Sequence, residues 1–109
     1  MSLDAPYIAR TAKPGQFAQI KCNDSFEPLL RRPFSIHRVN RNIEILYETV
    51  GRGTEILSNK KEGDKIDVLG PLGNGFTLPR ATNGEPRAII IAGGIGAAPL
   101  VYLAEELTK

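Results

Sequence analysis

The sequence predicts a mainly β protein that changes to α/β structure near its end. Short alternating segments separated by turn residues fill the first two-thirds of the chain, which is typical of a small antiparallel β-barrel or sandwich. A continuous apolar run follows, and a glycine-rich turn then leads into an amphipathic stretch. That order of strand, turn and helix is how a parallel α/β domain begins.

The alternating segments are the expected strands. Phe17–Cys22, Arg32–Val39 and Ile43–Val50 alternate apolar and polar side chains. Lys65–Leu69 is a shorter candidate. Pro33 favours an edge strand or the first position of a strand, because proline has no N–H to give to a sheet.

Turn residues separate these strands. Lys13–Gln16 holds Pro and Gly, which favour a tight turn. Gly51–Gly53 ends the third strand, and Thr54–Ser58 is long enough for one or two turns of helix. The glycine-dense segment Gly70–Phe76 predicts a shaped loop, which either walls a ring-binding site or closes a barrel.

The composition changes near residue 80. We expect a barrel domain over residues 1–79 without its N-terminal strand, a linker over 80–86, and the start of an α/β domain over 87–109. Arg87–Ala92 is typical of a strand buried on both faces. Four apolar residues then follow at helical spacing: Leu100, Leu103, Ala104 and Leu107. Because a lone βα unit cannot bury its strand, we expect the chain to be part of a longer two-domain protein.

Composition excludes several classes of protein. The 109 residues carry a net charge of only +2 with scattered basic residues, so we expect no nucleic-acid partner. No apolar run is long enough for a membrane span and no secretion leader opens the sequence, so a cytoplasmic location is the default expectation. The single cysteine and single histidine predict no metal site. No nucleophile–base pair stands out, so we predict no catalytic residue, and any chemistry would come from a cofactor.

The segment Arg31–His37 is the most informative part of the sequence. Arginine can grip a phosphate with two hydrogen bonds, and a serine hydroxyl can reach a ring heteroatom. Arg32 and Ser35 therefore suggest a dinucleotide held in an extended pose. The competing interpretation is an edge strand with an exposed arginine and a turn serine.

Two glycine turns add to this prediction. In Val50–Thr54 the glycines allow a close approach to an anion, while Thr54 can cap a helix or bond a phosphate oxygen. Ala92–Leu100 is similar to a pyrophosphate-binding turn, although its spacing is not GxGxxG. Each turn has a competing interpretation without ligand: an N-cap in the first case, close helix–strand packing in the second.

In this order, the strings RRPFSIH, LYETVGRGT, DVLGPLGNGF and AGGIGAAPL resemble the ferredoxin-reductase-like flavoproteins. Within that family they look most like the electron-transfer subunits of bacterial NAD-dependent dihydroorotate dehydrogenases. The resemblance implies an FAD-binding β-barrel followed by a nicotinamide-binding α/β domain. It covers nearly the whole chain, and the four strings together are far more specific than any one of them.

The resemblance also implies roles for individual residues. Arg32 would contact the FAD diphosphate, and Ser35 would approach the reactive edge of the flavin. The other implied cofactor residues are Pro33, Phe34, Leu46, Tyr47, Glu48, Gly53 and Thr54 for FAD, and Gly93, Gly94 and Gly96 for the nicotinamide site.

The family pattern implies electron transfer between NAD(H), FAD and a [2Fe–2S] centre, in service of an FMN-containing catalytic subunit that oxidises dihydroorotate in pyrimidine biosynthesis. The family's cysteine cluster and most of its nicotinamide domain are absent here, so we expect the chain to be inactive alone. Another ferredoxin–NADP-reductase-like or hydrogenase-linked diaphorase subunit is an alternative. So is a ligand-free β-barrel assembly module, and a homodimer could form by exchange of terminal segments.

Overall fold

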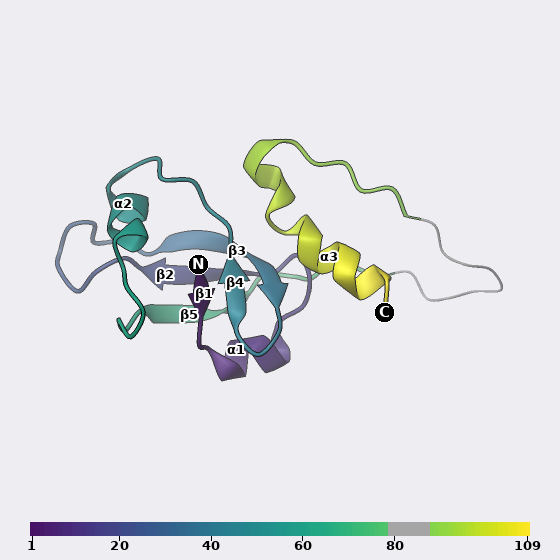
Figure 1. Cartoon of the computed structure of the whole chain (residues 1–109), viewed down its shortest axis with the longest axis horizontal. Helices are drawn as coiled ribbons and strands as arrows, with labels where there is room; N and C mark the ends of the chain where they lie inside the picture. The colour runs from purple at the N-terminus through teal and green to yellow at the C-terminus, as the bar shows by residue number, and fades with distance from the viewer. Residues whose placement is uncertain (79–87) are drawn as a thin grey trace.

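The computed structural model describes residues 1–78 and 88–109, and its centre is a five-stranded antiparallel half-barrel (Figure 1). The strands are β1 (Ser2–Leu3), β2 (Phe17–Lys21), β3 (Arg32–Val39), β4 (Ile43–Ile45) and β5 (Asp67–Leu72). The helices are α1 (Pro6–Thr11), α2 (Arg52–Ser58), the 3₁₀ turn η1 (Gly94–Ala97) and α3 (Leu100–Leu107). In space the strands follow the order β1-β4-β3-β2-β5, so β3 is central.

The alternation of side chains along the inner strands builds the core. In β3, Phe34 and Ile36 face inward, and the register sets Phe34 opposite Ala18 and Ile36 opposite Ile45. Ile20 and Ile43 complete the inner face with no exposed surface. Burying such side chains is the main favourable contribution to folding.

The helices α1 and α3 pack on the same hydrophobic cluster of the sheet. The helix α1 buries Ile8 against Ile36 and Ile43, and the ring of Tyr102 from α3 joins the same cluster. The hydroxyl of Tyr102 donates to the Ala12 carbonyl at 2.9 Å, and burial raises the pKa of that hydroxyl. Tyr102 therefore fastens α3 to the sheet at both its apolar and its polar end.

The mainly β fold is confirmed. β3 has the predicted bounds, and β2 ends one residue before the predicted Cys22. The predicted strand Ile43–Val50 is wrong beyond Ile45, because the chain leaves the sheet there and Leu46 and Val50 become exposed. β5 is shifted toward the C-terminus relative to the predicted Lys65–Leu69.

The prediction for Pro33 was partly wrong. Pro33 is the second residue of the central strand, opposite Gln19 of β2, not part of an edge strand. β4 pairs with β3 only from Ile36 onward. The missing N–H of Pro33 therefore costs no hydrogen bond between these two strands. At the N-terminus the two-residue strand β1 pairs with β4.

The predicted strand of the βα unit does not form. Residues 88–92 have no regular structure, and Ile89 and Ile91 are 90% and 87% exposed. No other described strand lies beside this run, and a strand cannot satisfy its backbone without a neighbour. The predicted helix does form, as α3. The predicted linker 80–86 and Arg87 lie outside the described residues.

Across residues 1–78 and 88–109, no helix is both long and apolar enough to cross a membrane.

Candidate functional site

An open groove of about 710 Å³ lies along the first half of β3. It gathers every predicted cofactor residue except Gly93 and Gly94, which lie in the turn that leads up to it. Four segments far apart in sequence form its walls: residues 32–35, 46–48, 50–54 and 95–99. The volume is within the range of roughly 300–1,000 Å³ that is typical of small-molecule and cofactor sites.

Arg32 supplies positive charge to the groove. Its Nη1 donates to the Leu30 carbonyl at 2.9 Å, and none of the ion pairs among the described residues uses its guanidinium. Its side chain passes close to Gly53, where an added Cβ would lie 3.4 Å from Arg32 Cγ and 3.1 Å from Cys22 Sγ. The absence of a side chain at Gly53 therefore lets Arg32 lie against the turn with donors left for an anion.

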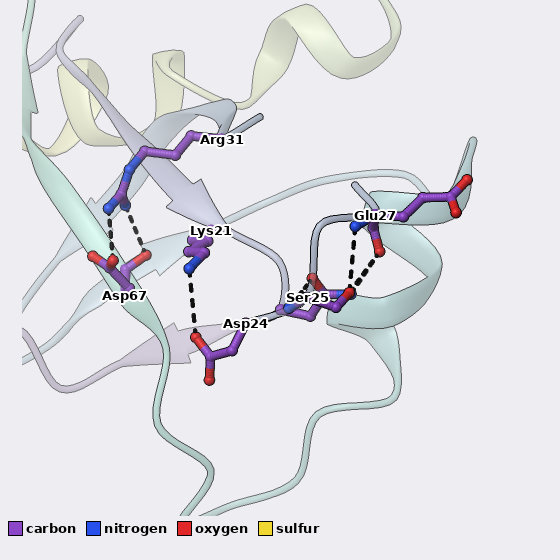
Figure 2. A network of polar contacts seen from close by, with 7 residues as sticks. Lys21, Asp24, Ser25, Glu27, Arg31 and Asp67 are labelled. Atoms are coloured by element: carbon purple, nitrogen blue, oxygen red, sulfur yellow. Dashed lines mark hydrogen bonds and ion pairs between the residues drawn. The ribbon is translucent and has the colours of Figure 1, made fainter. Parts of the chain in front are cut away.

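Arg31 has a different role from its neighbour. Figure 2 shows the loop that leads into β3, in which the Arg31 guanidinium reaches Asp67 on β5. Nη2 of Arg31 lies 2.6 Å from Oδ2 of Asp67, and this hydrogen bond lowers the pKa of that carboxyl. Elsewhere in the loop Ser25 donates to the Glu27 carbonyl at 3.0 Å. Arg31 is thus held outside the groove.

Thr54 shapes the turn before α2. Its Oγ1 accepts hydrogen bonds from the amides of Val50 and Gly51, at 2.9 and 3.2 Å, and donates to the Gly51 carbonyl at 3.0 Å. A hydroxyl has one proton and two lone pairs, so this set uses its full capacity. Of the two predicted roles, the structure therefore gives Thr54 the capping role.

An aromatic pair lies at the middle of the groove. The rings of Phe34 and Tyr47 meet edge to face, with centroids 5.6 Å apart and an interplanar angle of 65°. Burial raises the pKa of the Tyr47 hydroxyl, so the phenol stays neutral at physiological pH. Leu46 adds an apolar surface and Glu48 a carboxylate. This wall can take a flat ring with polar edges.

The end wall of the groove comes from the C-terminal segment. Ile95, Gly96, Ala98 and Pro99 line it, and Nδ1 of His37 lies 2.7 Å from the Ala98 carbonyl. Of these, the sequence prediction included only Gly96.

Val50, Gly51 and Arg52 also line the groove beside Thr54; the sequence analysis included them in an anion-binding turn but assigned them no individual role. The signal for Arg52 was present, since it stands between two glycines in the GRGT string. Its guanidinium is partly engaged by Glu55, with 3.1 Å between Nη1 and Oε2.

The segment Gly70–Phe76 was predicted to be a loop that either walls the site or closes a barrel, but its first three residues belong to β5. None of its residues lines the groove. The Phe76 amide donates to the Pro14 carbonyl at 2.7 Å, and Nε2 of Gln16 donates to the Gly73 carbonyl at 2.8 Å. The loop therefore closes the end of the half-barrel near the start of β2.

Cys22 is fully buried, as expected for a small hydrophobic residue, and burial raises the pKa of its thiol. In the part of the chain that the structure describes, no three His, Cys, Asp or Glu side chains lie together as metal ligands would.

Comparison with curated proteins gives strong similarity. An electron transfer subunit of dihydroorotate dehydrogenase B (NAD⁺) from Desulforamulus reducens is 53% identical over the whole chain. Subunits of the same name from Geobacillus sp. and Bacillus velezensis are 48% and 44% identical, again over the whole chain.

The chain spans only about 42–43% of the length of these relatives, which agrees with the expectation of a longer parent protein. No family model matches the chain. The resemblance inferred from the four strings is therefore confirmed: over its full length the chain is a homologue of the electron transfer subunits of dihydroorotate dehydrogenase B, corresponding to less than half of such a subunit.

Proposed function

We propose that this chain is the FAD-binding part of an electron-transfer flavoprotein. The observation that carries the proposal is the groove, which brings together four segments whose residues suit the parts of a flavin dinucleotide. It has a cationic end at Arg32, an aromatic middle at Tyr47 and a backbone-rich end at residues 95–99. FAD itself would carry the electrons, and the protein would supply position and electrostatics.

In this proposal the diphosphate lies beside Arg32. Arginine forms strong bidentate hydrogen bonds to phosphate, and this guanidinium has donors left after its bond to Leu30. Gly53 allows the close approach, and Thr54 fixes the turn around it. The chain's own residues therefore bind and orient the diphosphate without any rearrangement of the turn.

Tyr47 and, farther along β3, the Ser35 hydroxyl would hold the flavin ring. Pro33 and Phe34 join the two subsites, and Leu46 and Glu48 border the ring. The apolar surfaces would exclude water from the ring, while the Ser35 hydroxyl and the Glu48 carboxylate would face its polar edge.

In the longer parent protein, Gly93, Gly94 and Gly96 would begin a nicotinamide site. Electrons would pass between NAD(H), FAD and a [2Fe–2S] centre, and on to an FMN-containing catalytic subunit that oxidises dihydroorotate. These steps, like a cytoplasmic location, follow from the family resemblance and are part of the proposal. The chain as described holds no cysteine cluster for the iron–sulfur centre.

The direct test is titration of the purified chain with FAD, with binding measured by calorimetry and by flavin fluorescence. We expect saturable binding with one FAD per chain. Arg32→Ala should weaken it roughly 10- to 100-fold, as expected for loss of a charge-assisted contact. Arg31→Ala is the matched control, because this neighbouring arginine pairs with Asp67 outside the groove.

Three outcomes would contradict the proposal. If Arg32→Ala and Arg31→Ala weakened FAD binding equally, Arg32 would have no specific role in binding the diphosphate. Binding of FMN as tight as that of FAD would show that the adenylate half and the diphosphate make no contact. A chain that takes up no FAD would favour the ligand-free assembly module, for which the exposed Ile89 and Ile91 offer an apolar surface.

A further inference from the structure

The strand β3 serves two parts of the molecule. Its first half, residues 32–35, forms the floor of the groove. In its second half, His37 and Arg38 contact the C-terminal segment, and α3 lies beside the strand (Figure 1). One continuous strand therefore determines the positions of both the floor and the end wall.

The end wall is poorly held on its N-terminal side. A Cβ built on Gly93, Gly94 or Gly96 would meet no described atom within 4 Å. Ile91, just before the turn, is 87% exposed. Among the residues that the structure describes, the backbone hydrogen bonds of the turn are local, from Gly96 N to Gly93 O and from Ala98 N to Ile95 O. Neither of these bonds attaches the turn to the half-barrel.

The attachment comes at Ala98. Nδ1 of His37 lies 2.7 Å from its carbonyl oxygen, and the contact is partly buried. A carbonyl can only accept, so Nδ1 carries the proton and donates. Ala98 is itself 4% exposed and lines the groove together with Pro99. This bond is thus a direct connection between the half-barrel and the end wall.

The other contacts of α3 lie beyond the wall. Tyr102 donates to Ala12, and Nε of Arg38 lies 2.7 Å from Oε1 of Glu105, an ion pair by distance that is not aligned as a hydrogen bond. These hold the helix, whereas His37 holds the segment that touches the groove.

We propose that His37 is a positioning residue of the groove: its hydrogen bond to the Ala98 carbonyl holds residues 95–99 in place as the end wall. The proposal rests on the proposed flavin site for its effect on binding, but not for its effect on the wall. His37 does not line the groove itself, so it acts through the backbone of the C-terminal segment.

The test compares variants that keep or lose the donor. His37→Asn keeps an N–H donor near the position of Nδ1, while His37→Phe keeps a flat ring without any donor. In the chain without FAD, hydrogen exchange at the amides of Gly96 and Ala98 should be roughly three- to tenfold faster in His37→Phe, as expected for loss of one hydrogen bond. Exchange in β2 should not change, and His37→Asn should restore most of the protection.

With FAD as the probe, His37→Phe should weaken binding by a similar factor, roughly three- to tenfold. It should also make the bound flavin more accessible to iodide quenching. Tyr102→Phe is the matched control, because it removes a donor from α3 outside the groove and should leave the FAD affinity unchanged. If His37→Phe does not fold, His37→Leu removes the same donor.

Unchanged exchange at Ala98 in the donor-less variant would overturn the proposal, and so would an Asn variant that exchanges as fast as the Phe variant. Faster exchange with unaltered FAD affinity would overturn the claim that the wall matters for binding. If the wild-type chain takes up no FAD, the proposed function fails, while the exchange experiment still decides whether His37 positions the wall.

Discussion

Similar apolar sequences adopt different structures in the half-barrel and in the C-terminal segment. In the half-barrel, apolar residues such as Ile36 and Ile45 are covered from both sides by paired strands and packed helices. In the C-terminal segment, the equally apolar Ile89 and Ile91 are almost fully exposed. The strand-forming potential of both is high, yet only one region forms strands.

The difference teaches what each element needs from its surroundings. A helix satisfies its own backbone hydrogen bonds, so α3 forms and needs only one surface for its apolar face, where Tyr102 packs against Ile36 and Ile43 of the sheet. A strand needs another strand for every backbone group, and residues 88–92 have none among the described residues. The longer relatives are consistent with this, since more than half of their length has no counterpart here.

The largest expected effect comes from replacing one isoleucine in each region. Ile36→Ala empties a fully buried position in the central strand and should lower the free energy of unfolding by roughly 2–5 kcal/mol. Ile91→Ala removes a side chain that is already in water and should change it by less than about 0.5 kcal/mol. Urea denaturation of both variants measures the comparison, and equal effects would mean that Ile91 is buried in solution.

The second effect concerns two glycines with positive φ, one in each region. At Gly15 (φ +91°) an added Cβ would lie 2.8 Å from the Phe76 ring, so Gly15→Ala combines backbone strain with a clash and should cost roughly 2–4 kcal/mol. Gly94 (φ +53°) has open space, so Gly94→Ala carries only the strain, about 1 kcal/mol. Thermal melting of the two variants shows which substitution is more destabilising. A larger loss for Gly94→Ala would mean that the turn at residues 93–96 is tightly packed.

A third, smaller effect tests how α3 is attached. Tyr102→Phe keeps the buried ring but leaves the Ala12 carbonyl without its donor, at a cost of roughly 0.5–1.5 kcal/mol. Hydrogen exchange should become faster in α3 and stay constant in β2 and β3. Faster exchange throughout the sheet would instead mean that α3 and the half-barrel unfold as one unit.

The smallest expected effect is a change in the pKa of the Asp67 carboxyl on the surface of the half-barrel. Arg31→Ala should raise the pKa of Asp67 toward its ordinary value of 3.8, because the hydrogen bond that lowers it is lost. The folded-state pKa is depressed, so the pair's stabilisation is present above the unfolded value and is lost as the pH falls through the folded value. Carboxyl NMR gives the pKa directly, and an unshifted Asp67 would show that the pair does not form in solution.

Much of the half-barrel could be predicted from the sequence. The bounds of β3 follow from its alternation and from the turns around it, and the cationic and aromatic parts of the groove follow from the RRPFSIH and LYETVGRGT strings. These features depend on residues close together in the chain, where spacing and residue type carry the information.

What could not be predicted depends on contacts between distant residues. The bond from His37 to Ala98 joins positions 61 apart, so no local pattern indicates it. The early end of β4 and the failure of residues 88–92 to form a strand both depend on which neighbours are present. The helix α1 had one local signal, Pro6 at its first position, which was weak beside the turn that follows.

The single cysteine has a practical consequence for studying this chain. Cys22 Sγ lies under Gly53 and close to Arg32, with no surface exposed to solvent. A maleimide can reach this sulfur only when the packing around Gly53 and Arg32 opens, and while the site is closed burial also raises the pKa of the thiol and keeps the reactive thiolate scarce. The rate of alkylation therefore reports how often the cationic end of the groove opens. Mass spectrometry can measure this rate without any introduced label.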